Sequence, residues 1–124
     1  MADPNIAAST ATLYKKSVGY ALTNTLTGTI VANASGSGVV IEVFSAYVAN
    51  IDGASSVDIT MDVRKNSGTA YKIANTVPLP ADTTEIMIAK DGPVVLQEGD
   101  SLRGGASANN DAEAVVSYNE YAAS

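Results

Sequence analysis

The chain has 124 residues, no cysteine, no histidine, a formal net charge of −6 and a pI near 4.3. This length fits one domain, and the missing residue types exclude disulfides, thiolate zinc sites, imidazole metal ligands and histidine-based triads. The acidic balance argues against a nucleic-acid partner, because phosphate backbones are bound by clustered Lys and Arg. No apolar run approaches the roughly 20 residues that cross a bilayer, so we expect no membrane partner. The first ten residues also lack the pattern of a signal peptide.

The first elements lie before residue 35. We predict a flexible N-terminal arm at residues 1–11, because this stretch combines Pro4 and Asn5 with several alanines. Two segments rich in Thr, Val and aromatic residues follow at 12–22 and 25–34, and both favour strands.

The best-defined element spans residues 38–51, GVVIEVFSAYVANI. If this segment is extended, its odd-numbered residues share one face, which we predict to be core. That face is formed by Val39, Ile41, Val43, Tyr47, Ala49 and Ile51. The opposite face carries Val40, Phe44 and Val48, so it is also apolar and needs a cover.

Residues 56–65 alternate between apolar and polar side chains, which indicates a half-buried antiparallel strand. Val57, Ile59, Met61 and Val63 are expected to face the core, with Asp58, Thr60, Asp62 and Arg64 in solvent.

Five further strands are expected towards the C-terminus, at residues 71–77, 85–90, 93–97, 101–107 and 113–121. Pro78 and Pro80 should end the first of them, because proline cannot donate to a ladder. Eight or nine short strands separated by turn signals are typical of an all-β protein, an antiparallel β-sandwich of jelly-roll-like form. We predict one such domain over residues 12–121 and a short tail at residues 122–124.

Two carboxylates surround a glycine at Glu98, Gly99 and Asp100. A calcium site needs six to eight oxygens in a shaped loop, and no EF-hand spacing is present. We interpret these residues as a structural turn in which Gly99 takes a conformation that other residues avoid and the acids stay solvated.

No other pattern indicates catalysis. Asp58 and Asp62 would lie about 13 Å apart on one strand face, too far for a glycosidase pair, and we expect both to be surface charges. No nucleophile elbow or Ser-x-x-Lys motif occurs. The sequence therefore predicts neither an enzyme nor a cofactor or metal ligand.

The informative anomaly is a low charge content: 46% of residues are hydrophobic and only 16% are charged. Val40, Phe44 and Val48 are therefore a candidate interface. They pack either under the opposing layer of the sandwich or against a neighbouring subunit. The adjacent basic residues Lys15–Lys16 and Arg64–Lys65 are expected opposite carboxylates of another subunit.

An ordered set of segments carries a family resemblance. VAN is soon followed by Ile51-Asp52-Gly53, and IANTVPLPADTTEIMI, PVVLQEGDSLRGGAS and AVVSYNEY come after it. Together these segments, which span roughly Thr25 to Tyr121, resemble small virion structural proteins of tailed bacteriophages, especially marine ones. The resemblance implies a β-sandwich assembled on particles, a turn at Gly99 with Leu96 and Leu102 entering the core on either side, and no catalytic residue.

From these observations we expect a virion protein, a capsid decoration or cement protein that binds the major capsid protein. It would be a homo-oligomer on the capsid surface, made in the host cytoplasm. The alternatives are a head–tail adaptor, tail or fibre component, and a carbohydrate-binding module. The last would use Tyr14, Tyr20, Tyr71 and Tyr121 to stack on sugars.

Overall fold

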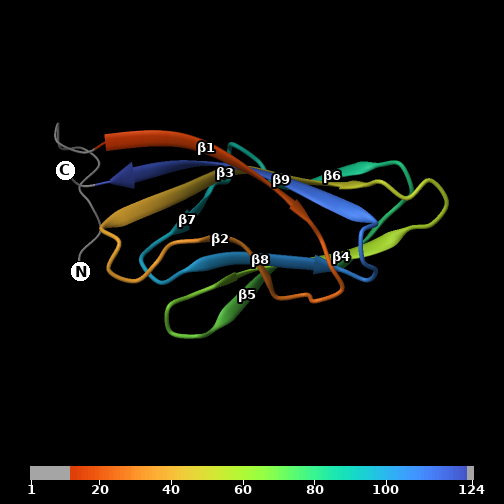
Figure 1. Ribbon diagram of the computed structural model, residues 1–124, viewed down its shortest axis with the longest axis horizontal. Coiled ribbons are helices and arrows are strands. Elements are labelled where there is room, and N and C mark those ends of the chain that lie inside the picture. Colours follow the sequence, from red (N-terminus) through yellow and green to blue (C-terminus); the bar gives the residue numbers. More distant parts are fainter. Residues whose placement is uncertain (1–11, 123–124) are drawn as a thin grey trace.

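The computed structural model describes residues 12–122, and these residues form two antiparallel sheets packed face to face (Figure 1). The predicted arm at residues 1–11 lies outside the described residues, as do residues 123–124 of the predicted tail. Nine strands are present in the described part: β1 Thr12–Ala21, β2 Gly28–Ala32, β3 Val39–Asn50, β4 Val57–Arg64, β5 Ala70–Leu79, β6 Thr84–Ile88, β7 Val94–Leu96, β8 Ser101–Ala106 and β9 Ala112–Ala122. The prediction of an all-β antiparallel sandwich is confirmed.

We call the two layers sheet A and sheet B. Sheet A has the strand order β1-β9-β3-β6, and β7 also pairs with β3. Sheet B has the order β2-β8-β4-β5. β1 thus forms one edge of sheet A and β6 and β7 form the other, while β2 and β5 are the outermost strands of sheet B. No helix in the described residues is long and apolar enough to cross a membrane.

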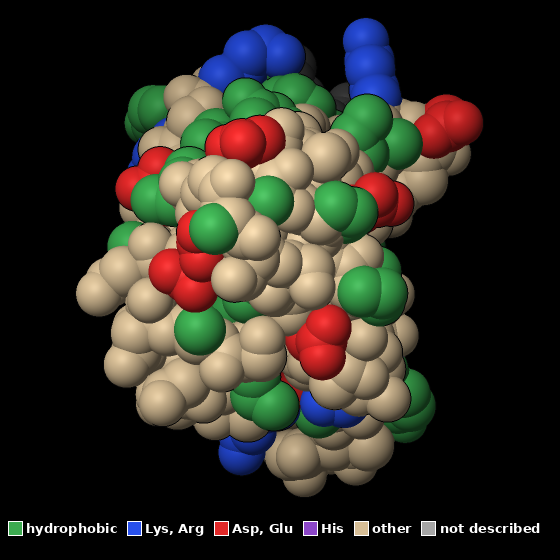
Figure 2. All heavy atoms as spheres, turned by 90° about the vertical axis from the view of Figure 1, so that its right-hand side faces the viewer, with side chains coloured by type: hydrophobic (Ala, Val, Ile, Leu, Met, Phe, Trp, Pro, Cys, Tyr) green, Lys and Arg blue, Asp and Glu red, His purple; other side chains and the backbone are tan. Residues whose placement is uncertain are grey.

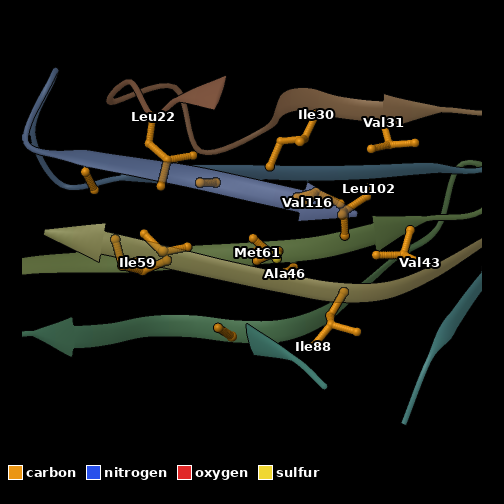
Figure 3. Packing of buried hydrophobic residues seen from close by; sticks show 14 of the residues in the cluster. Leu22, Ile30, Val31, Val43, Ala46, Ile59, Met61, Ile88, Leu102 and Val116 are labelled. Carbon is orange, nitrogen blue, oxygen red and sulfur yellow. The ribbon is translucent and has the colours of Figure 1, made fainter. Parts of the chain in front are cut away.

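The core lies between the two sheets, where aliphatic side chains from both layers interdigitate (Figure 3). Ile59 and Met61 from β4 and Leu102 from β8 meet Val43 and Val116 from sheet A, and all five are fully buried. Burying one such side chain stabilises the fold by about 1.5–3 kcal/mol, so this layer is the main source of stability.

The prediction for β3 is right in its first half and wrong in its second. Ile41 and Val43 face the core as expected, but the register with β9 shifts between Val43 and Ser45. This β-bulge adds one residue, and the extra residue exchanges the two faces of the strand beyond it. Val48 is consequently buried in the core, whereas Tyr47 and Ile51 are exposed.

β5 also differs from the prediction, because it continues through Pro78 to Leu79. β5 is the outermost strand of sheet B, so one of its sides makes no hydrogen bonds to another strand. Proline is tolerated on such a side, because no backbone N–H is needed there. Thr76 has a positive φ of 48° within the strand. The register against β4 shifts at this point, between Ile59 and Met61.

Candidate functional site

The outer face of sheet A is a broad surface that mixes apolar and polar side chains. The pairing registers place its side chains in rows that run across β1, β9 and β3. These rows are Leu13, Tyr121 and Val40; then Lys15, Asn119 and Glu42; then Ser17, Ser117 and Ser45; then Gly19, Val115 and Tyr47; and finally Ala21, Glu113 and Ala49. Only Lys15, Glu42 and Glu113 among these fifteen residues are charged.

Two of the three predicted interface residues belong to this face. Val40 and Phe44 are half-buried, and Phe44 lies at the bulge of β3. Val48 does not belong to it: the bulge turns this side chain into the core, where it cannot contact a partner. Tyr47, 40% exposed, occupies the outer face instead.

A hollow of about 240 Å³ opens beside Phe44. It is lined by Lys15, Glu42, Phe44, Lys90, Pro93 and Asn119. The Lys15 ammonium lies 5.8 Å from the centroid of the Phe44 ring, within the range of a cation–π contact. The hollow therefore combines an aromatic wall with charges of both signs, which suits a protruding side chain of a protein partner better than an extended ligand.

Glu42 organises the polar centre of the same face. The Asn119 amide donates a hydrogen bond to Glu42 Oε1 at 3.1 Å, and the Tyr121 hydroxyl donates to the same oxygen at 3.4 Å. Burial, and then the charge of Glu42, raise the pKa of Tyr121 above its usual range. This end of the face therefore presents a carboxylate that is bound by an amide and a phenol group.

The four tyrosines considered for sugar stacking do not form one platform. Tyr71 is exposed on sheet B, whereas Tyr121 belongs to the outer face of sheet A. Tyr20 packs against the core. Tyr14 is next to Leu13 on β1 and so points to the opposite side of the sheet from Tyr121.

Glu98, Gly99 and Asp100 form a tight turn, as predicted from the sequence. The Asp100 amide donates to the Gln97 carbonyl at 3.0 Å, and Gly99 has a φ of 89°. The prediction that both acids stay solvated is wrong for Asp100, which is only 2% exposed. Its carboxylate accepts hydrogen bonds from the Gln97 and Asn66 amides, both at 2.9 Å, and pairs with Lys65. Asp100 thereby fixes two neighbouring turns to each other.

Asp62 is likewise not the surface charge that alternation predicts, because it is only 1% exposed. It belongs to β4, a central strand of sheet B, where long side chains from both neighbouring strands reach over it. Arg103 donates two hydrogen bonds to its carboxylate at 2.8 and 3.0 Å, and Lys72 Nζ lies 3.7 Å away. The hydrogen bond to Asp62 raises the pKa of Arg103. Asp58 is exposed as expected, so the two carboxylates cannot act as a pair.

The basic residues expected opposite another subunit find carboxylates in the same chain. Lys16 Nζ lies 3.1 Å from Glu120 on the neighbouring strand, and Lys65 pairs with Asp100. Lys16 and Lys65 therefore have carboxylate partners without a second subunit, and contacts of Lys15 and Arg64 with another subunit stay a prediction.

One end of the sandwich is acidic. The loops at residues 22–27, 51–56, 80–83 and 107–111 meet there and contain no Lys or Arg. Figure 2 faces this end and shows carboxylates spread over it, with Lys and Arg towards the upper and lower margins. Within residues 12–122 no three acidic residues lie close enough together to hold a metal ion. This end therefore offers a dispersed negative charge, which is unfavourable for a phosphate backbone.

Comparisons with known proteins find solved structures of low similarity to this chain. No protein-family model and no curated protein matches the chain. Two crystal structures of a pentameric capsid protein isolated from metagenomic phage sequences, one solved by iodide SAD phasing, are similar to it at 18% identity and a TM-score of 0.40. The match covers 83% of this chain and 59% or 60% of theirs, so this chain spans about three fifths of their length. The candidate surface therefore rests on the residues of this chain alone.

Sequence reasoning placed Tyr47 on the core face, because the outward direction of this side chain depends on the bulge in β3. Nothing in the sequence marks that bulge, since Val43, Phe44 and Ser45 all fit a regular strand. The signal in the sequence was the presence of apolar residues on both faces of residues 38–51; one residue of the second face, Val48, is buried in the core, and contact of Val40 and Phe44 with a partner stays a prediction.

Proposed function

We propose that this protein is a non-enzymatic structural protein of a bacteriophage virion. More specifically, we propose a capsid decoration (cement) protein that binds the shell formed by the major capsid protein. The segments that resemble tailed-phage virion proteins support this assignment. The observation that carries it is the outer face of sheet A, which is as wide as three long strands and carries uncharged apolar or polar residues at twelve of its fifteen positions.

The chemistry of this face defines the partner surface that it fits. Phe44, Tyr47 and Val115 supply apolar contact area, and the three serines of the middle row supply small hydrogen-bonding groups. Such a surface matches a partner with apolar side chains at its centre and polar groups around them, as in ordinary protein interfaces. Repetition over many copies makes even a weak contact hold a shell tightly.

The experiment is co-sedimentation of the purified protein with phage shells that lack it, using two matched tyrosine variants. Tyr47→Asp places a charge on the outer face of sheet A, and Tyr71→Asp places one on sheet B, where Tyr71 is 61% exposed. We expect Tyr47→Asp to weaken shell binding at least tenfold and Tyr71→Asp to leave it unchanged. Equal effects of the two variants, or no binding by the unmodified chain, would overturn the proposal.

The number of copies on the particle separates decoration from the adaptor and tail alternatives. A decoration protein covers the shell and reaches hundreds of copies, whereas an adaptor ring at one vertex has about 6 or 12. Quantitative gel densitometry against the major capsid protein measures this ratio.

A further inference from the structure

β1 of sheet A differs from the outermost strands of sheet B in how well it is protected from pairing. β5 carries Pro78 and the bulge at Thr76, and β2 is five residues long with a register shift of its own. β1 is ten residues long, contains no proline and pairs with β9 in one unbroken register. Within residues 12–122 no strand pairs with its other side. A long regular strand with one free side is a template for another strand.

The opposite end of sheet A is complementary to β1. β6 is also outermost, and its Ile86 is 67% exposed, the highest value among the large hydrophobic residues of the described chain. β6 and the turn before it carry the exposed acids Glu85 and Asp82, whereas β1 carries Lys15 and Lys16. Leu13 and Tyr14 on β1 are exposed as well. Each strand thus offers apolar side chains and one sign of charge.

Strand direction permits these two strands to pair without any change in the fold. Every neighbouring pair in the order β1-β9-β3-β6 is antiparallel, so β1 and β6 run in opposite directions. A second copy placed beside the first in the same orientation brings its β1 antiparallel to β6. The alternation of strand directions in sheet A then continues from one copy to the next.

We propose that β1 of one copy pairs with β6 of a second copy of this chain, joining their A sheets into one continuous sheet. Lys16, which also pairs with Glu120 of its own chain, lies opposite Glu85 across this contact. Lys16 pairs with Tyr118, a residue packed against the core, and Glu85 pairs with the core residue Val48, so both are on the inner side of the sheet. In the same register Lys15 lies opposite Ile86 on the outer side, and Ser17 lies opposite Thr84.

This contact joins unlike surfaces, so it repeats from copy to copy and closes into a ring when the rotation between copies permits. The right-handed twist of sheets supplies such a rotation. The inference names the strands that would form the homo-oligomer expected from the sequence, and it does not depend on binding to a shell.

Cysteine cross-linking tests the pairing directly, because the chain has no cysteine of its own. Ser17→Cys and Thr84→Cys are introduced together, since both side chains are exposed. Oxidation, or a short bismaleimide that tolerates a slipped register, should give a ladder on a denaturing gel that ends at one discrete species. Each single variant should stay at monomer size. The control combines Ser17→Cys with Ser35→Cys in the loop between β2 and β3, and it should give no ladder.

Three results would overturn the inference. The first is a double variant that does not cross-link. The second is efficient dimer formation by Ser17→Cys alone, which would mean that two β1 strands pair with each other. The third is a native mass equal to the monomer at all concentrations, which would mean that β1 is covered from elsewhere in its own chain or by another protein.

Charge reversal gives an independent readout by sedimentation equilibrium. Lys16→Glu and Glu85→Lys should each weaken self-association by roughly tenfold, and the two changes combined in one chain should restore it. If the combined variant associates as weakly as the single ones, or if no variant changes association, the pairing is wrong. Unchanged shell binding by Tyr47→Asp with intact cross-links would count against the proposed function alone.

Discussion

At the scale of single residues, buried carboxylates stabilise this protein by fixing neighbouring segments to each other. Asp62 on β4 is covered by Arg103 from β8 and Lys72 from β5. Asp100 accepts hydrogen bonds from the backbone amides of Asn66 and Gln97, which belong to two neighbouring turns. Neither arrangement offers an open position for a substrate, so both acids have structural roles.

Asp62→Ala should destabilise the fold strongly, because it leaves the mostly buried Arg103 guanidinium without its partner. Breaking a buried ion pair in this way costs about 3–5 kcal/mol. Chemical denaturation measures the loss. Asp58→Ala, on the same strand but exposed, is the matched control and should stay within about 0.5 kcal/mol of the unmodified chain. Equal effects of the two substitutions would contradict the burial of Asp62.

Gly99→Ala should also be destabilising. Gly99 has a φ of 89°, and a Cβ there would lie 2.3 Å from Asn66 Oδ1 and 2.8 Å from Asn66 Cβ. The left-handed backbone alone costs a non-glycine residue about 1–2 kcal/mol. Gly92→Ala, where a Cβ meets nothing within 4 Å, should be nearly neutral in the same thermal unfolding assay. A neutral Gly99→Ala would contradict the turn geometry.

At the scale of strands, the bulge in β3 decides which residues form the core and which form the candidate surface. The register shift after Val43 places Val48 inside and Tyr47 outside. A regular strand would place these two residues the other way round.

Val48→Asp and Tyr47→Asp therefore form a direct comparison. Val48→Asp buries an unpaired charge in the core, so we expect a loss of several kcal/mol and little folded protein by circular dichroism. Tyr47→Asp should fold with nearly unchanged stability. Reversed results would mean that β3 is regular and that the candidate surface has been assigned to the wrong side chains.

The strands, their number and their antiparallel packing were predictable from alternating hydrophobicity and turn residues, because both patterns are local in the sequence. Which residues in the second half of β3 face the core was not predictable, because the bulge depends on how β9 pairs with β3. The burial of Asp62 was not predictable either, because it needs Arg103 from a strand far along the chain. The continuation of β5 through Pro78 depends on the strand being outermost, which is a property of the whole sheet.

At the scale of the whole molecule, the surface of the sandwich has three regions of different chemistry. The outer face of sheet A mixes apolar and polar side chains, the loop end is acidic, and β1 and β6 expose strands of opposite charge. In the proposed assembly the β1 and β6 strands join copies side by side, and the outer face of sheet A is left free for the shell.

The most direct test is a cryo-EM map of a phage particle that contains this chain, at a resolution that places the sandwich. We predict hundreds of copies on the shell, with the outer face of sheet A against the major capsid protein. Absence of the chain from the particle, or a shell-bound chain whose outer face of sheet A points into solvent, would contradict the account.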